Sequence, residues 1–204
     1  MSVRETSLID RRSLRASPTA RGDWMQTATG RAFYPFDPRP EDIFIEDIAA
    51  GLSRQCRYAG QLHADVEIYS TAEHCVALAR HFRAHGDIEL AKWALLHDAA
   101  EAYLNDIVRP VKQALTAYRG VETLIMAAIC DRFGLPRQEP AEVKDADRRI
   151  LIDERRAVMT CPPLPWASDK NCAPLNAVIL CYPPHMARFA FLHLFGELFS
   201  EESS

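Results

Sequence analysis

The chain has 204 residues, of which 48% are hydrophobic and 25% charged, and its formal net charge is −4. These values are ordinary for one globular domain with a sizeable core. The acidic balance argues against a nucleic-acid-binding protein, and no apolar run approaches the ~20 residues that a membrane-spanning helix needs. The six cysteines form no Cys-x-x-Cys pair and no signal peptide opens the chain, so we expect a cytoplasmic protein with reduced thiols.

The start of the chain differs in composition from the rest. Residues 1–23 carry five arginines, several Ser and Thr and little that a core would bury, so they are predicted to form a disordered arm. Residues 24–200 are predicted to form a single domain. It opens with a lead-in over residues 24–40 that is rich in aromatic residues, Gly and Pro, a composition typical of extended chain with a small hairpin.

Helical patterns fill the remainder. Apolar residues recur at helical spacing between cap and breaker residues, and Ser70 with Glu73 has the form of a capping box. Helices are therefore expected at residues 40–54, 70–85, 87–103, from 110 over a short stretch, and at 121–133, 142–159 and 183–199. No run alternates as a strand does. The predicted fold class is all-α, a helical bundle.

The helix expected at residues 87–103 carries three ionisable side chains in an apolar stretch, His97, Asp98 and Glu101. Burying such groups costs several kcal/mol unless they are paired or bound to a metal. One interpretation is a hydrogen-bonded core histidine beside a buried salt bridge. The other is a metal site, which would need further ligands from neighbouring helices.

Two such ligands are present in other predicted helices. His74 lies on the first turn of one, and Asp147 falls on the apolar stripe of another. With His97 and Asp98 they give two nitrogen and two carboxylate donors, which suit Mn²⁺, Co²⁺, Fe²⁺ or Zn²⁺, with Mg²⁺ possible. Adjacent helical residues diverge by about 100°, so one ion can meet all four only in a bundle core.

The order of His74, His97-Asp98 and Asp147 resembles the signature of the HD-domain metal-dependent phosphohydrolases. The similarity is closest to the small 5′-deoxynucleotidases and the phage-type dATP triphosphohydrolases, and it covers roughly residues 52–159. Further segments match in the same order: Leu52-Ser-Arg-Gln-Cys-Arg-Tyr58, Tyr69-Ser-Thr-Ala-Glu-His74, Leu95-Leu-His-Asp-Ala-Ala-Glu101, Asp106-Ile-Val-Arg-Pro-Val-Lys112 and Val143-Lys-Asp-Ala-Asp147.

The resemblance implies roles for residues around the ion. The four side chains of the signature would hold a metal that polarises a phosphoryl oxygen and lowers the pKa of water. Glu101 would be catalytic, as a general acid and base. Asp106 would help to position the water or the substrate sugar, although a helix cap before Pro110 is an alternative for it.

Cations and an aromatic side chain complete the implied site. Arg57 is the first choice for a phosphate clamp, and Lys112 and Lys144 would suit a longer polyphosphate. Without the resemblance, each would be an ordinary surface charge. Tyr58 matches an aromatic position that would stack on a base or sugar, with a core or rim aromatic as the alternative.

The expected function is hydrolysis of (deoxy)nucleotides. The reaction would convert either a 5′-monophosphate to nucleoside plus phosphate or a dATP-like triphosphate to nucleoside plus triphosphate, and the two lysines lean slightly towards the triphosphate. Alternatives are a phosphodiesterase acting on another phosphoester, which the lack of a second histidine-rich block disfavours, and a non-catalytic nucleotide-binding regulatory module. The resemblance also implies that the protein binds a small-molecule nucleotide as its substrate. It further implies that the protein forms a homo-oligomer.

Overall fold

The computed structural model describes residues 20–166 and 172–200, so most of the predicted arm lies outside the described residues. The described part is mostly helical, with one two-stranded sheet, which confirms the all-α fold class. No described helix has the length and apolar character needed to cross a membrane. The elements are β1 (Met25–Gln26), β2 (Ala32–Phe33), the 3-10 helix η1 (Pro40–Asp42), α1 (Ile45–Leu52), the 3-10 element η2 (Arg57–Gly60), α2 (Thr71–Ala84), α3 (Ile88–Leu96), α4 (Glu101–Leu104), α5 (Arg109–Lys112), α6 (Thr116–Phe133), α7 (Ala141–Val158) and α8 (Pro184–Phe199).

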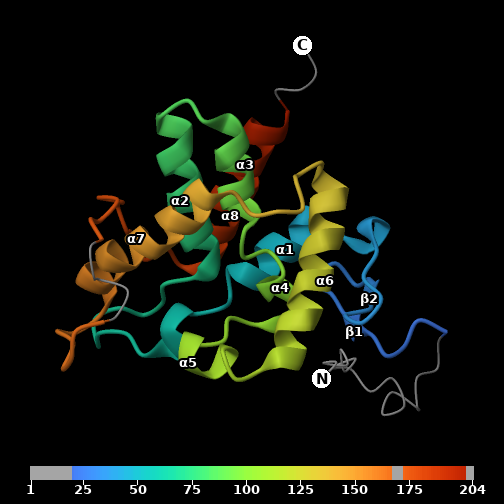
Figure 1. Cartoon of the computed structure of the whole chain (residues 1–204), viewed down its shortest axis with the longest axis horizontal. Helices are drawn as coiled ribbons and strands as arrows, with labels where there is room; N and C mark the ends of the chain where they lie inside the picture. Colours follow the sequence, from blue (N-terminus) through green and yellow to red (C-terminus); the bar gives the residue numbers. More distant parts are fainter. Residues whose placement is uncertain (1–19, 167–171, 201–204) are drawn as a thin grey trace, which may run out of the picture.

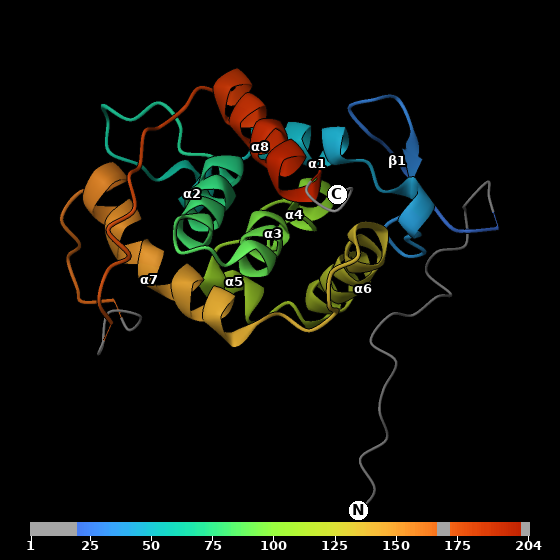
Figure 2. The same cartoon turned by 90° about the horizontal axis from the view of Figure 1, so that it is seen from above.

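The helical hairpin of α2 and α3 forms the centre of the molecule. Helix α8 packs on one side of it and α7 on the other, as Figure 2 shows from above. Helix α1 contacts α4, α8 and α2, and α6 runs along η1 and α5 (Figure 1). Fully buried side chains fill the space between these helices: Ile48, Leu52, Leu78, Leu95, Leu96, Ile125, Ile129, Ile150 and Phe191. Each such side chain contributes about 1.5 to 3 kcal/mol by leaving water.

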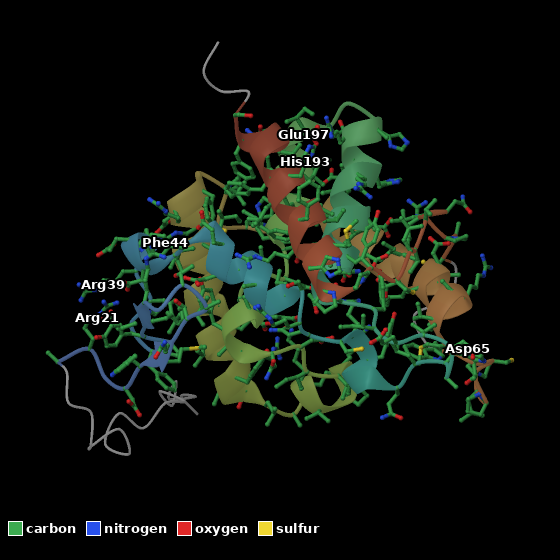
Figure 3. All side chains as sticks on the ribbon, turned by 180° about the vertical axis from the view of Figure 1, so that it is seen from behind. Arg21, Arg39, Phe44, Asp65, His193 and Glu197 are labelled. Carbon is green, nitrogen blue, oxygen red and sulfur yellow. The ribbon has the colours of Figure 1, made fainter. Side chains whose placement is uncertain are left out.

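The lead-in contains the small hairpin that its composition predicted, with β1 and β2 antiparallel. Its turn is tied to α1, because the Thr29 amide and hydroxyl each donate to the Asp47 carboxylate at 2.8 Å. Arg21 and Arg39 both pair with Asp37, and Figure 3 shows these two arginines together at one edge of the molecule. Arg21, which the sequence places in the predicted arm, is thus held against the lead-in.

Two predicted helices are interrupted in the structure. The helix expected at residues 40–54 is split into η1 and α1, because Phe44 has an extended backbone. The helix expected at residues 87–103 ends at Leu96 and resumes as α4. Between α3 and α4 the backbone hydrogen bonds join residues three apart instead of four. The Ala99 amide donates to the Leu96 carbonyl and the Glu101 amide to the Asp98 carbonyl, both at 2.9 Å. A 3-10 stretch inside a helix often marks a functional position.

The capping box at the start of α2 is only half formed. The Ser70 hydroxyl accepts from the Glu73 amide at 3.2 Å, as predicted. The Glu73 carboxylate does not return to Ser70 but accepts from the amides of Leu180, Cys181 and Tyr182 at 2.6 to 2.9 Å. It therefore anchors the extended segment that leads into α8.

The later helices follow the predicted boundaries closely, with one exception. The short helix expected from residue 110 is α5, and α7 and α8 match within one residue. Helix α6 begins at Thr116, five residues before the predicted start, and Gly120 lies within the helix without interrupting it. It ends at Phe133, and its C-cap residue Gly134 has a φ of 70°, the left-handed conformation that is common at the end of a helix.

The packing of α1 on α4 depends on Gly51. A Cβ there would lie 2.8 Å from the Ala102 carbonyl oxygen and 2.9 Å from its Cα. We expect Gly51→Ala to lower the free energy of unfolding by about 1 to 3 kcal/mol, since the two helices would have to separate. Gly196→Ala in α8 is the matched control, because its Cβ would meet nothing within 4 Å. Urea denaturation measures both, and equal effects would contradict the close packing.

Candidate metal centre

The four predicted metal ligands meet where α2, α3 and α7 approach one another. His74 Nε2 lies 3.1 Å from both His97 Nε2 and an Asp147 oxygen, and His97 Nε2 lies 3.2 Å from an Asp98 oxygen. Donor atoms about 2.1 Å from one ion are about 3.0 to 3.4 Å apart at octahedral or tetrahedral angles. The observed spacing therefore fits a shared ion, and this His/Asp cluster is a possible metal-binding site.

The tautomers of the two histidines support the same conclusion. His74 Nδ1 lies 2.5 Å from a Glu154 oxygen, and His97 Nδ1 lies 2.8 Å from the Ala94 carbonyl oxygen. Each Nδ1 is thus assigned the proton that it donates, which leaves the Nε2 lone pairs facing the centre. Metal-ligating histidines are held in this way. Two lone pairs 3.1 Å apart repel each other unless a proton or a cation lies between them.

Electrostatics make the centre attract positive charge. Burial would lower the pKa of His97, but the adjacent Asp98 carboxylate and the Cys75 side chain together outweigh burial and raise the pKa well above its ordinary value. Burial would likewise raise the pKa of Asp98, yet His97 beside it lowers the pKa. A divalent cation at this position would replace the proton that the raised pKa of His97 favours. It would also offset the charge of both carboxylates and accept the lone pairs of both imidazoles.

The centre is closed on one side and open on the other. The His74 side chain is fully buried and that of His97 is 4% exposed, whereas Asp98 is 22% and Asp147 39% exposed. Ligands from solvent therefore reach it over the two carboxylates. An ion with four protein ligands would keep positions for water and substrate on this side.

Glu154 is a central residue that the sequence analysis missed. It is fully buried in α7, and besides His74 it accepts from the Tyr69 hydroxyl at 2.9 Å and from Arg57 Nη2 at 3.3 Å. A signal for it does exist. Glu154 lies seven residues, or two helical turns, after Asp147 and so shares its face of α7.

The two predicted catalytic carboxylates lie near the cluster. Glu101 is buried, with one oxygen 3.2 Å from Lys112 Nζ and the other without a partner among the described residues. Burial, Asp98 and Asp106 raise the pKa of Glu101 well above its ordinary value. Burial also raises the pKa of Asp106, which is half-buried. The alternative role of Asp106 as a helix cap is wrong, because the N-cap residue of α5 is Val108 and no side chain caps this helix.

The predicted phosphate-binding residues differ in how the structure places them. Arg57 is buried, and its Nη1 lies 3.5 Å from an Asp98 oxygen, so it borders the centre. Tyr58 donates its hydroxyl to Glu154, which favours the structural alternative over stacking on a base. Lys112 lies between Glu101 and Glu122, the latter at 2.6 Å.

Lys144 is the fourth predicted phosphate-binding residue. It is exposed on α7, about one turn before Asp147, and is not among the side chains of the cluster. The structure therefore places Arg57 beside Asp98 and Lys112 beside Glu101, and it leaves Lys144 exposed.

Comparison with known proteins identifies bacterial relatives. The chain is 40% identical over 133 residues to the uncharacterised protein YfdR of Escherichia coli strain K12, and the match covers 65% of this chain and 71% of YfdR. The chain belongs to the YfdR family. It is also 42% identical over 128 residues to an uncharacterised protein of Rhodobacter capsulatus, which covers 60% of this chain and 64% of that protein. No model of a known protein family matches the chain, and membership of the YfdR family assigns no activity.

Metal binding can be measured directly. We expect Mn²⁺, Co²⁺ or Zn²⁺ at 100 times its Kd to stabilise the EDTA-treated protein by about 2.7 kcal/mol, which raises Tm by about 5 to 10 °C. Asp147→Asn should abolish the shift, because it removes a ligand. Asp145→Asn on the same helix is the control, since Asp145 pairs with Arg148 at the surface. A Tm that none of these metals changes would contradict the site.

Proposed function

We propose that the chain is an HD-domain metal-dependent phosphohydrolase that acts on (deoxy)nucleotides. The observation that carries this proposal is the convergence of two imidazoles and two carboxylates at a centre that is open on one side, with Arg57 and Glu101 beside it. The resemblance of the sequence to the HD-domain hydrolases supports the same reaction class.

The roles of the surrounding residues follow from their environments. A bound divalent ion would supply Lewis-acid chemistry, polarising the phosphoryl group and lowering the pKa of water. Glu101 has a raised pKa and one buried oxygen without a partner among the described residues, so it is suited to accept and return a proton. Arg57 would neutralise phosphate charge from the edge of the centre.

The pairing of the cations favours a monophosphate substrate. Arg57 is already shared between Asp98 and Glu154, and Lys112 between Glu101 and Glu122. Of the three predicted phosphate-binding cations, only the exposed Lys144 makes no ion pair among the described residues, so little free positive charge borders the centre for the additional phosphates of a triphosphate. We therefore infer conversion of a 5′-monophosphate to nucleoside plus phosphate, against the slight lean that the two lysines give from the sequence.

Product analysis tests the reaction. We expect the Mn²⁺- or Co²⁺-loaded protein to release inorganic phosphate from nucleoside 5′-monophosphates, and EDTA to stop the release. Glu101→Gln should lower kcat by about 10² to 10⁴ through loss of the proton-transferring carboxylate while metal binding is retained. Glu142→Gln, at an exposed position on α7, is the control. Release of intact triphosphate would favour the triphosphohydrolase. If the metal-loaded protein hydrolyses none of these nucleotides, the nucleotide proposal is contradicted.

Substrate choice provides a second test. Glu122→Gln removes one of the two carboxylates that hold Lys112 and so makes more of its charge available to a polyphosphate. Since a partly exposed ion pair is worth up to about 1 kcal/mol, we expect kcat/KM for triphosphates to rise up to about fivefold relative to monophosphates. Kinetics on matched mono- and triphosphates of one nucleoside measure the ratio. An unchanged ratio would show that the pairing of Lys112 does not limit triphosphate use.

A further inference from the structure

The Glu154 carboxylate is saturated with hydrogen bonds. One oxygen accepts from His74 Nδ1 at 2.5 Å and from the Tyr69 hydroxyl at 2.9 Å. The other accepts from Arg57 Nη2 at 3.3 Å and from the Tyr58 hydroxyl. An ionised carboxylate has about four acceptor positions, so this group is fully used. Burial would raise its pKa, but Arg57 and His74 outweigh burial and lower the pKa to about 2.

These partners include two functional side chains that come from different elements. His74 belongs to the first turn of α2 and is a candidate metal ligand. Arg57 belongs to η2 and also contacts Asp98 at the edge of the centre. Glu154 itself is in α7, on the same face as Asp147. One buried carboxylate thus joins three segments of the chain around the metal centre.

The backbone conformation of η2 directs two neighbouring side chains to this carboxylate. Tyr58 and Ala59 have φ values of 57° and 53°, a left-handed conformation that non-glycine residues rarely adopt. Neighbouring side chains usually diverge, yet here those of Arg57 and Tyr58 both reach the same Glu154 oxygen. Strained residues of this kind persist where the surrounding contacts fix them, and they concentrate at functional sites.

We propose that Glu154 is a positioning residue, which orients His74 towards the metal and Arg57 towards the phosphate from a single carboxylate. As acceptor of the His74 Nδ1 proton, it directs the Nε2 lone pair at the centre. Its contact with Arg57 fixes the guanidinium between Glu154 and Asp98. The part of this inference that concerns Arg57 rests on the proposed function. The part that concerns His74 requires only the metal centre.

The test is Glu154→Gln, which keeps the shape of the side chain and removes its charge. We expect Mn²⁺ affinity, measured by calorimetry on the EDTA-treated protein, to fall about 10- to 100-fold, the usual effect of losing such a partner. The absorption spectrum of bound Co²⁺ should change as His74 loses its fixed orientation. Binding of inorganic phosphate to protein saturated with Mn²⁺ should also weaken, because Arg57 is released.

Asp153→Asn is the matched control. Asp153 is the neighbouring buried carboxylate on α7, and it accepts from the Ala177 amide at 3.2 Å, away from the centre. Its substitution should leave Mn²⁺ affinity and the Co²⁺ spectrum unchanged. If Glu154→Gln does not fold, Glu154→Asp retains the charge but withdraws it from His74, and the same loss of affinity is expected.

The outcomes separate this inference from the proposed function. Unchanged Mn²⁺ affinity in a folded Glu154 variant, or an equal loss in Asp153→Asn, would overturn the positioning of His74. Weaker Mn²⁺ binding with unchanged phosphate binding would overturn the Arg57 half alone. If the unsubstituted Mn²⁺-loaded protein binds no inorganic phosphate, the proposed function fails, while the His74 half is still decided by metal affinity.

Discussion

The contact between the His74 imidazole and the Glu154 carboxylate is the interaction on which the rest of the centre depends. It joins the start of α2 to α7 through two fully buried side chains. Burying either group alone would cost several kcal/mol. Because the two groups are paired, each offsets the cost of burying the other. Because Asp147 lies two turns before Glu154, the contact that secures Glu154 also brings Asp147 to His74 Nε2.

The first turn of α2 is held from two directions. Glu73 accepts three backbone amides from the segment before α8, and His74 contacts α7 and the turn after α3. Adjacent residues of one helix therefore serve different purposes, one anchoring the chain and one facing the centre. A ligand on the first turn would otherwise lie at a fraying helix end, where its orientation would vary.

How far the sequence predicted this arrangement depended on what surrounds each residue. His97, Asp98 and Asp147 were found because a polar residue in an apolar pattern is conspicuous. Glu154 was missed because it stands in the run Asp153-Glu-Arg-Arg156, which has the composition of a solvated helix face. Its burial depends on Arg57, 97 residues away in the sequence, and no local pattern reports such a partner.

The turn after α3 shows a similar limit. Residues 87–103 have the pattern of one continuous helix, and the helical content was predicted correctly. The bonds that tighten at residues 96–101 were not, because no Gly or Pro marks the break. The position of the break is set by tertiary contacts, since His97 is held by the centre while Glu101 must face Lys112. Tertiary contacts thus overrode local propensity at the residues of the candidate metal centre.

The same reasoning applies to the charges. A sequence gives the number of lysines and arginines near a motif, and that number alone favours the hypothesis of a polyphosphate substrate. The structure shows how those cations are paired, and two of them already face two carboxylates each. Under the proposed function, a substrate would meet the charge left after pairing, together with that of a bound ion. Under the proposed function, a site with so much internal neutralisation would suit a ligand of low charge, and the affinity for that ligand would come largely from a bound metal.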